Sequence, residues 1–494
     1  MSRPRAAALA GLLALVLPMS GCGTRMSPEQ IAAADGTALT LRTSPPSGQP
    51  AVTADDAGRV SADPSPGATA AAGPSTSVTP AASPRAGAPA PRVSSAASAA
   101  PRVPTGPSVP TGGDGACRQS LAPVVLGQTS PSSGIIGATD FNMRTGLALW
   151  LREVNARGGV QCHPVRLYQM DDAADPARVT TNLATLVNEK KAIAIVGAGL
   201  GTTFAAAKRF AEQNQVPFVG GDLVEPSWFS SRWFFPQGGS PLAAYAGAMK
   251  EAAVAAHSTK VGLVYCVEAA ICGQINANFE AMAKVAGLQV VLRKVSSITS
   301  PDYTAECQAL RSAGAGAVFV AMEGSGNARF ARSCISLGYR PAIATSALAV
   351  TAESVLDPNI RRLGAFLGAA TAPFLATDSP GARGFRAAYD RFAPGSSVDQ
   401  NSITQFTAGR LFEAAVAAVS ASARTGPITR ELLLDGLWRV KNETLGGLAP
   451  PVTFHRDTLP AANDCYASLT IAAAGYAAPE GGRFECFAGL PPGY

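Results

Sequence analysis

The stretch from residue 160 to residue 219 alternates short apolar runs with an amphipathic segment, and this alternation most restricts the possible fold. Three short runs have the length and composition of strands: the β-like run 165–168 and the runs 193–196 and 216–219. Between the first two, Val179, Leu183 and Leu186 recur at spacings of four and three, which predicts a helix. Strands that alternate with helices in this way predict a parallel sheet covered by helices. Such sheets bind ligands beyond the carboxyl ends of their strands.

The loop that follows the second of these strands is rich in glycine and ends in two threonines. Residues 197–203 read Gly-Ala-Gly-Leu-Gly-Thr-Thr and lie where the next helix begins. The N–H groups of such a loop and of a helix start suit an anion, and threonine hydroxyls are further donors. The alternative is that Thr202 only caps the helix. We expect Gly201, Thr202 and Thr203 to contact a ligand.

Residues 1–22 have the features of a secretory signal. Two arginines precede an apolar run from residue 6 to residue 17, and small residues follow it. The run is too short to span a bilayer as a mature helix. Residues 19–22, Met-Ser-Gly-Cys, resemble the bacterial lipobox, which implies cleavage before Cys22 and lipidation of its thiol. A lipid would hold the protein on the membrane surface; a plain signal with a chance cysteine is the alternative.

Residues 23–116 are dominated by Ala, Pro, Ser, Thr and Gly, and no aromatic residue occurs before Phe141. Such a segment cannot bury enough apolar surface to offset the entropy of ordering it. We therefore expect a disordered linker, with a root-mean-square reach of about 50–60 Å. It would hold a folded part away from the membrane.

The composition argues against several classes of partner. The net charge of +6 over 494 residues is mild, and no basic block or basic–aromatic stripe suggests nucleic acid. No Cys pair has CxxC spacing, and the only histidines are His163, His257 and His455, so we expect no metal and no cofactor. No G-x-S-x-G elbow or other catalytic constellation occurs, so we expect no enzyme.

Eight cysteines remain besides Cys22, and an even number in an exported chain suggests disulfides. Eight cysteines allow about 105 pairings, so the pairing stays a hypothesis. The expected pairs are Cys117–Cys162, Cys266–Cys272, Cys307–Cys334 and Cys465–Cys486.

The segment GLALWLREVNARGGVQCHPVRLYQMDDAADPARV combines an Asn and a Gly-Gly pair after a helix with Asp-Asp and Asp-Pro further on. It resembles the opening of the type I extracytoplasmic solute-binding proteins of the leucine/isoleucine/valine-binding kind. Further segments resemble the same family in order and spacing: 260–265, 301–304, 310–320, 331–339 and 451–454. The last of them lacks the first glycine of the family pattern. The resemblance covers about Cys117 to Phe487.

The resemblance implies an α/β fold of two Rossmann-like lobes with parallel sheets, joined by three crossovers, which is the type I periplasmic-binding-protein fold. The first lobe is expected from 117–257 with 371–447, and the second from 258–370 with 448–494. A monomer of this kind would capture a small polar solute in the cleft between the lobes and deliver it to an ABC permease. It would work outside the cytoplasm, anchored by its lipid.

The resemblance also places three candidate ligand residues in other loops, Asp222, Glu323 and Ser346. Asp222 stands where amino-acid binders of the family tend to have small residues and a Thr; it could bind an amine or form a local Asx turn. Glu323 stands where they often have an aromatic, and it could pair with a cation or be a solvated acid. Ser346 stands where they often have the acid that holds the α-amino group. An amino acid or a related amide or carboxylate is expected, but these departures leave the solute open.

Other functions remain as alternatives. The protein could be a ligand sensor or a scaffold lipoprotein that has no transporter. Gly197-x-Gly199 invites a dinucleotide-binding interpretation, but Thr202 stands at the third glycine position. The aromatic run 233–235 is expected to be a buried strand rather than a stacking platform.

Overall fold

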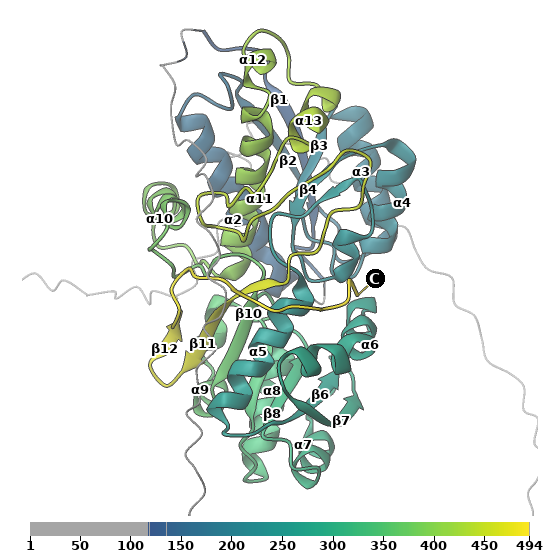
Figure 1. The fold of residues 1–494 in the computed structure, drawn as a ribbon, viewed down its shortest axis with the longest axis vertical. Helices are drawn as coiled ribbons and strands as arrows, with labels where there is room; N and C mark the ends of the chain where they lie inside the picture. Colours follow the sequence, from purple (N-terminus) through teal and green to yellow (C-terminus); the bar gives the residue numbers. More distant parts are fainter. Residues whose placement is uncertain (1–116, 118, 135, 494) are drawn as a thin grey trace, which may run out of the picture. The chain divides into compact units, whose positions relative to one another are not determined.

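The computed structural model describes Cys117, residues 119–134 and residues 136–493. The expected signal peptide, the expected lipidation site Cys22 and the expected linker 23–116 lie outside the described residues. The described part of the chain contains two sheets, each covered by helices, and Figure 1 shows one sheet above the other. This arrangement confirms the expected two-lobed α/β architecture.

The first sheet has the strand order β2-β1-β3-β4-β5, and all of its pairs are parallel. Its strands are β1 (Val124–Ser130), β2 (Val165–Asp171), β3 (Ala194–Ala198), β4 (Phe218–Gly221) and β5 (Phe234–Phe235). Because β1 lies between β2 and β3, the chain reverses its direction of travel across the sheet there. Every residue of β3 and β4 is buried, which explains their continuous apolar sequence.

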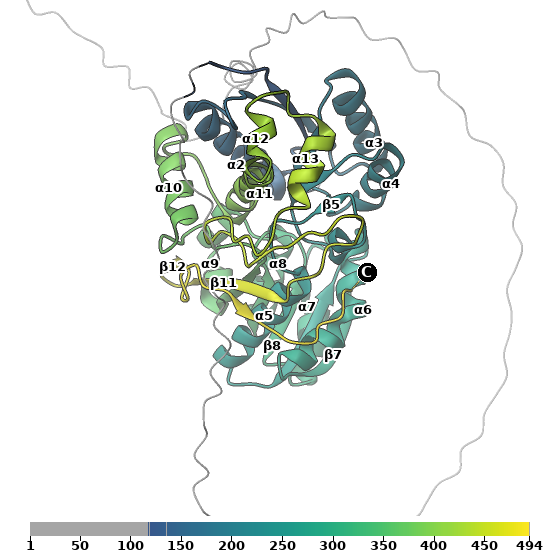
Figure 2. The same ribbon diagram turned by 45° about the horizontal axis from the view of Figure 1, so that its top comes forward.

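Helices cover both faces of the first sheet (Figures 1 and 2). They are α2 (Gly137–Ala156), α3 (Pro176–Ala184), η1 (Thr185–Glu189), α4 (Phe204–Asn214), η2 (Pro226–Phe229), α10 (Pro380–Phe392), α11 (Gln400–Ala417), α12 (Ser420–Ala423) and α13 (Arg430–Leu437). Helix α11 packs closely on α2 because Gly409 has no side chain, and a Cβ there would lie 2.2 Å from the ring of Trp150. Residues far apart in the sequence therefore complete the first lobe.

The second sheet has the order β12-β11-β10-β9-β8-β6-β7, and β13 pairs with β11. Its strands are β6 (Lys260–Tyr265), β7 (Gln289–Val295), β8 (Ala317–Ala321), β9 (Ala342–Ser346), β10 (Ala365–Ala369), β11 (Cys465–Ala472), β12 (Gly475–Ala477) and β13 (Glu485–Cys486). Strands β6 to β10 are parallel, whereas β11, β12 and β13 pair antiparallel. Its helices are α5 (Pro241–Ala255), α6 (Ala270–Val285), α7 (Thr304–Ser312), α8 (Gly324–Ser336), η3 (Ala352–Leu356) and α9 (Pro358–Leu363).

The aromatic run 233–235 contributes strand β5 to the core of the first lobe. Phe234 and Phe235 are buried, and the ring of Phe234 stacks on that of Phe218 with centroids 4.7 Å apart. The expectation of a buried strand is therefore confirmed.

Two stretches lie in a different lobe from the one expected. Helix α5 packs on strands β8 to β11 of the second sheet, since its small apolar side chains are buried nearly all round, and Gly247 lies against the ring of Tyr466. The first lobe boundary therefore falls before Pro241 rather than after His257. Residues 448–462 stay on the first lobe, where Val452 and Glu443 form a β-bridge and Phe454 packs edge-on against Phe235.

The three crossovers between the lobes lie side by side. The Gly239 N–H donates to the Ala370 carbonyl at 2.8 Å, and the Ser240 N–H donates to the Asn463 carbonyl at 2.6 Å. A Cβ on Gly239 would lie 2.0 Å from the carbonyl oxygen of Cys465, so only glycine permits this approach. In Figure 1 the C-terminal segment, drawn in yellow, passes from the upper lobe to the edge of the lower sheet.

The four expected disulfides are present: Cys117–Cys162, Cys266–Cys272, Cys307–Cys334 and Cys465–Cys486. The first ties the start of the first lobe to the residues before β2, and the last joins β11 to β13. Among the described residues, no helix combines the length and the hydrophobicity that a bilayer span requires.

Candidate ligand-binding site

A cavity lies between the two lobes, at the carboxyl ends of strands from both sheets. Its volume is about 950 Å³, counting the space open to solvent at its mouth. The first lobe contributes residues from the start of α2 and from the loops after β3 and β4. The second lobe contributes α5, the start of α6, and the residues at the ends of β6, β8 and β9. This is the position at which open parallel sheets bind ligands.

The wall of this interlobe cavity is mainly apolar. Large hydrophobic side chains line it from both lobes: Ile136, Met143, Val224, Ile271, Ile275, Ile298, Phe319, Met322 and Leu348. The charged residues that line it are all acids: Asp140, Asp222, Glu268 and Glu323. None of the described lining residues is Lys, Arg or His.

The predicted loop after β3 reaches the cavity with two of its three candidate residues. Gly201 and Thr202 line the cavity, whereas Thr203 does not and is only 2% exposed. Thr202 does not cap α4; its hydroxyl donates to the Ala174 carbonyl at 3.4 Å. The Thr203 hydroxyl is buried without a hydrogen-bond partner in the described part of the chain. The sequence therefore identified the loop but not which threonine faces the cavity.

Asp222 lines the cavity, but its carboxylate is already bonded within the first lobe. It accepts hydrogen bonds from the Leu200 N–H at 2.5 Å, the Trp228 Nε1–H at 2.8 Å and the Val224 N–H at 3.4 Å. The bond to Val224, two residues on, is that of an Asx turn. Burial raises the pKa of Asp222, and these hydrogen bonds oppose the rise. The carboxylate thus joins the loop after β3 to the loop after β4.

Glu323 also lines the cavity and is bonded as the N-cap of α8. It accepts hydrogen bonds from the N–H groups of Ser325 and Gly326, the latter at 2.8 Å, and pairs with Arg329 at 3.4 Å. Ser346, at the end of β9, lines the cavity as well, and its hydroxyl oxygen accepts a hydrogen bond from the Leu348 N–H at 3.2 Å. Both residues thus line the cavity from the ends of two neighbouring strands of the second sheet.

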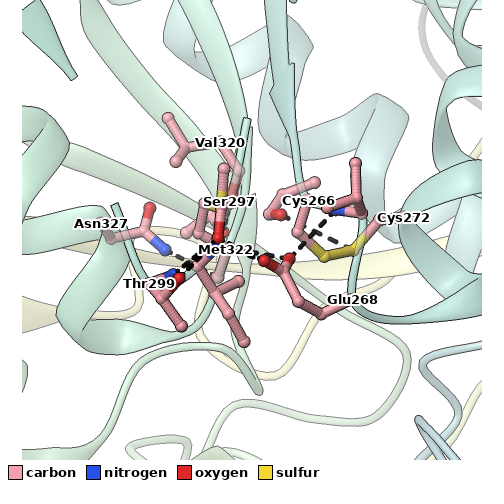
Figure 3. The surroundings of a disulfide bond; sticks show 12 residues. Cys266, Glu268, Cys272, Ser297, Thr299, Val320, Met322 and Asn327 are labelled. Carbon is pink, nitrogen blue, oxygen red and sulfur yellow. Dashed lines mark hydrogen bonds between the residues drawn. A yellow bond between two sulfur atoms is a disulfide. The ribbon is translucent and has the colours of Figure 1, made fainter. Parts of the chain in front are cut away.

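The Cys266–Cys272 disulfide forms part of the cavity wall, beside Glu268 (Figure 3). Figure 3 shows the Glu268 carboxylate directed toward Ser297, whose hydroxyl donates to it, and the Ile298 N–H donates to it at 3.2 Å. Although burial opposes the change, these hydrogen bonds lower the pKa of Glu268. Glu268 thus ties the loop after β6 to the loop after β7.

Asp140 is a cavity residue that the sequence analysis missed. It lies in the first turn of α2, is 8% exposed, and its carboxyl has no hydrogen-bond partner among the described residues. Burial, followed by the negative charges of Asp222, Asp172 and Asp399, raises the pKa of Asp140 well above its usual range. The signal that could have found it is its place after the Ser/Gly loop that follows the first strand.

Tyr245 of α5 is a second missed residue, and it bridges the lobes at the cavity. Its hydroxyl donates to the carbonyl of Val224 at 2.8 Å. Burial raises the pKa of this hydroxyl, so it stays a proton donor. Among the described residues, no group of three or more His, Cys, Asp or Glu side chains could hold a metal ion.

The sequence pattern that defines the periplasmic binding protein family matches residues 123–475. A curated relative, an amino acid binding protein of Pseudomonas aeruginosa, is 31% identical over 83 residues, which span 17% of this chain and 22% of that protein. The chain thus matches only about a fifth of that relative's length.

Solved structures share the fold at low sequence identity. A possible leucine/isoleucine/valine-binding protein from Rhodopirellula baltica is 20% identical with a TM-score of 0.61, over 72% of this chain and 96% of that one. A fatty acid ABC transporter substrate-binding protein from Thermomonospora curvata is 18% identical with a TM-score of 0.61, over 78% and 94%. A solute-binding protein of an ABC transporter from R. palustris, in complex with benzoate, is 14% identical with a TM-score of 0.59, over 75% and 99%.

The family match extends over most of the chain, the solved relatives have the same two-lobed fold, and the cavity lies between the lobes at the carboxyl ends of both sheets. The chain therefore belongs to the periplasmic binding protein family and is an extracytoplasmic protein of the type I, solute-binding kind.

Proposed function

We propose that this protein captures a small solute with a mainly apolar body in its interlobe cavity and delivers it to the permease of an ABC-type uptake system. It would do so as a monomer that a lipid on Cys22 anchors to the extracytoplasmic face of the cell membrane. The observation that carries the proposal is the cavity itself, which both lobes build from apolar side chains at their strand ends. Cavities lined in this way, with few polar groups, are typical of small-molecule sites.

The lining favours a more apolar solute than the small polar one that the sequence suggested. Amino-acid binders of the family hold an α-carboxylate and an α-amino group, whereas here hydrophobic side chains predominate and Ser346 stands in place of the expected acid. The relatives described as binding a fatty acid or benzoate carry ligands with large apolar bodies. A ligand of this kind would bury its apolar surface against Phe319 and the isoleucines of both lobes.

The mechanism would be closure of the lobes about the three adjoining crossovers. The solute stabilises the closed form only to the extent that it binds that form more tightly than the open form. The bond from Tyr245 to the Val224 carbonyl spans the lobes at the cavity, so it can report closure to the residues that touch the solute. The permease would recognise the closed form.

The test is a thermal-shift screen of the mature chain against amino acids, amides, polyamines, fatty acids, aromatic acids and sugars. A ligand at a hundredfold its dissociation constant should stabilise the protein by about 2.7 kcal/mol, which is a shift of several degrees. A hit among compounds with apolar bodies supports the proposal. A hit confined to sugars or other wholly polar solutes contradicts the apolar class, and a folded protein that responds to nothing favours a sensor or a scaffold.

A further inference from the structure

We propose that the solute carries an ammonium group on its apolar body and that Asp140 binds this group. The inference rests on the proposed capture of a solute in the interlobe cavity and names the chemical class of that solute. It would be an apolar amine, and not a carboxylate such as a fatty or aromatic acid.

The argument begins with the four acids that line the cavity, since the protein itself bonds three of them. Asp222 accepts from Leu200 and Trp228, Glu268 from Ser297 and Ile298, and Glu323 from the first N–H groups of α8. These three hold loops and a helix start together. Asp140 alone lines the cavity without a hydrogen-bond partner among the described residues, although it is only 8% exposed.

Two of the positions that could hold an anionic ligand are already occupied by carboxylates of the protein. The Leu200 N–H, in the glycine loop before α4, donates to Asp222, and the N–H groups at the start of α8 donate to Glu323. A carboxylate at either place would have to displace, or lie beside, a carboxylate of the protein. No Lys, Arg or His among the described lining residues offsets these charges. The cavity therefore disfavours an anion.

The surroundings of Asp140 supply more negative charge from neighbouring elements. Asp172, after β2, accepts a hydrogen bond from the Thr129 hydroxyl at 2.7 Å, and Asp399, the N-cap of α11, accepts one from Asn142 at 2.8 Å. Arg144 lies one turn after Asp140 in α2. Its guanidinium donates hydrogen bonds to Ser132 Oγ at 3.0 Å and to the Gln169 carbonyl at 3.1 Å. Asp222 lines the same cavity as Asp140.

An ammonium group suits this setting better than a neutral donor does. A buried carboxylate is costly unless it is paired and hydrogen-bonded. An ammonium group brings both the opposite charge and N–H donors, and such charge-assisted bonds are the stronger ones. The apolar wall formed by Ile136 and Met143, one turn to either side of Asp140, would bury the adjoining methylene groups of the ligand.

The experiment compares ligands that share a carbon skeleton and differ only in their polar group. Hexylamine, hexanoate and hexanol form one series; 3-phenylpropylamine, 3-phenylpropionate and 3-phenylpropanol form a second. Dissociation constants are measured by calorimetry on the full mature chain. We expect each amine to bind at least about tenfold more tightly than its carboxylate and its alcohol. Asp140→Asn should remove this preference, with an unchanged circular dichroism spectrum.

A matched control removes the same charge from another buried aspartate of the first lobe. Asp399 does not line the cavity, and asparagine is an equally good N-cap. Asp399→Asn should therefore keep the preference for amines within about threefold.

The outcomes separate this inference from the proposed function. If carboxylates or alcohols bind as tightly as the amines, both in the natural chain and in Asp140→Asn, the solute is not an amine. The inference is then overturned, while the capture of an apolar solute stays supported. An equal loss for all polar groups in Asp140→Asn means that Asp140 shapes the cavity without binding a charge, which also overturns the inference. If no member of either series binds, the capture of an apolar solute fails together with it.

Discussion

Asp222 and Asp140 both line the cavity from the first lobe. Of the two carboxylates, only that of Asp222 accepts hydrogen bonds from other described residues of the protein. Asp222 could be predicted as a cavity residue because it directly follows a strand whose carboxyl end faces the ligand. That its carboxylate is occupied depends on Leu200 and Trp228, 22 and 6 residues away, which no local pattern reveals. Asp140 escaped prediction because an acid in the first turn of a helix is ordinarily an exposed residue that favours the helix dipole.

The two threonines before α4 make a residue-scale prediction. Thr202→Ala should weaken binding of the tightest screened ligand, because Thr202 lines the cavity. Thr203→Ala should leave binding unchanged and be neutral or stabilising, because it removes a buried hydroxyl that has no partner in the described part of the chain. Calorimetric affinity and thermal midpoint of both variants check this. Equal affinity in Thr202→Ala and the natural chain would remove the loop from the site.

A buried glutamate makes the second prediction at this scale, and it concerns pH. Glu225 is 3% exposed; burial, and then the charge of Asp222, raises its pKa to about 8. In an unfolded chain the pKa of a glutamate is about 4.3. The folded protein thus holds a proton that the unfolded chain has lost, so the free energy of unfolding falls as the pH rises between these values.

Glu225→Gln should remove this part of the pH dependence. Because glutamine has no charge to bury, the variant should be more stable than the natural chain above pH 8, by on the order of a few kcal/mol, and gain little near pH 4. Urea unfolding across this pH range measures the difference. Glu280→Gln, on the exposed face of α6, controls for the loss of one charge. A stability difference that does not vary with pH would mean that Glu225 is ionised in the fold.

At the scale of elements, helix α5 shows that a sequence pattern does not predict which sheet a helix covers. Small apolar residues lie nearly all round this helix, so no polar face marks which sheet it covers. The contact with β11 at Gly247 and Tyr466 joins segments more than 200 residues apart, and it decides the lobe. Periodicity predicted the strands and the helix between residues 165 and 219, whereas the assignment of elements to lobes needed these distant contacts.

The disulfide beside the cavity gives a prediction for the β6–α6 loop. Cys266 and Cys272 are separated by 6 residues, and Cys117 and Cys162 by 45. The entropy of loop closure predicts that alanine at both positions of a pair costs about 2 kcal/mol for the short loop and about 4 kcal/mol for the long one. Because only the short loop lines the cavity, its loss should weaken ligand binding more.

The two double variants serve as each other's control. The variant without Cys117–Cys162 should have the lower thermal midpoint, and the variant without Cys266–Cys272 should have the lower ligand affinity. If the Cys117–Cys162 variant loses as much affinity as the Cys266–Cys272 variant, the disulfide in the cavity wall has no local role in the site.

At the scale of the molecule, the family resemblance supplied what periodicity could not. Alternating strands and helices predict parallel sheets, but they do not show that the chain crosses between two of them three times. The positions of the crossings then depend on packing. Helix α5 and residues 448–462 each lie in the lobe opposite to the one expected, because contacts within that lobe decide their place.

The last prediction concerns the closure of the whole molecule about these crossings. Gly239→Ala would place a methyl group 2.0 Å from the Cys465 carbonyl oxygen and push two crossovers apart. We expect the variant to fold less stably, by about 1–3 kcal/mol, and to show a smaller ligand-induced decrease of the radius of gyration in X-ray scattering.

Gly273→Ala is the matched control for this change. A Cβ at Gly273 meets no atom within 4 Å, and alanine favours a helix, so this variant should be at least as stable as the natural chain and close fully. Normal closure in Gly239→Ala would mean that the crossovers tolerate separation and that the hinge lies elsewhere. Reduced closure in Gly239→Ala alone would place the hinge at the crossings, where the Gly239 N–H donates to Ala370 and the Ser240 N–H donates to Asn463.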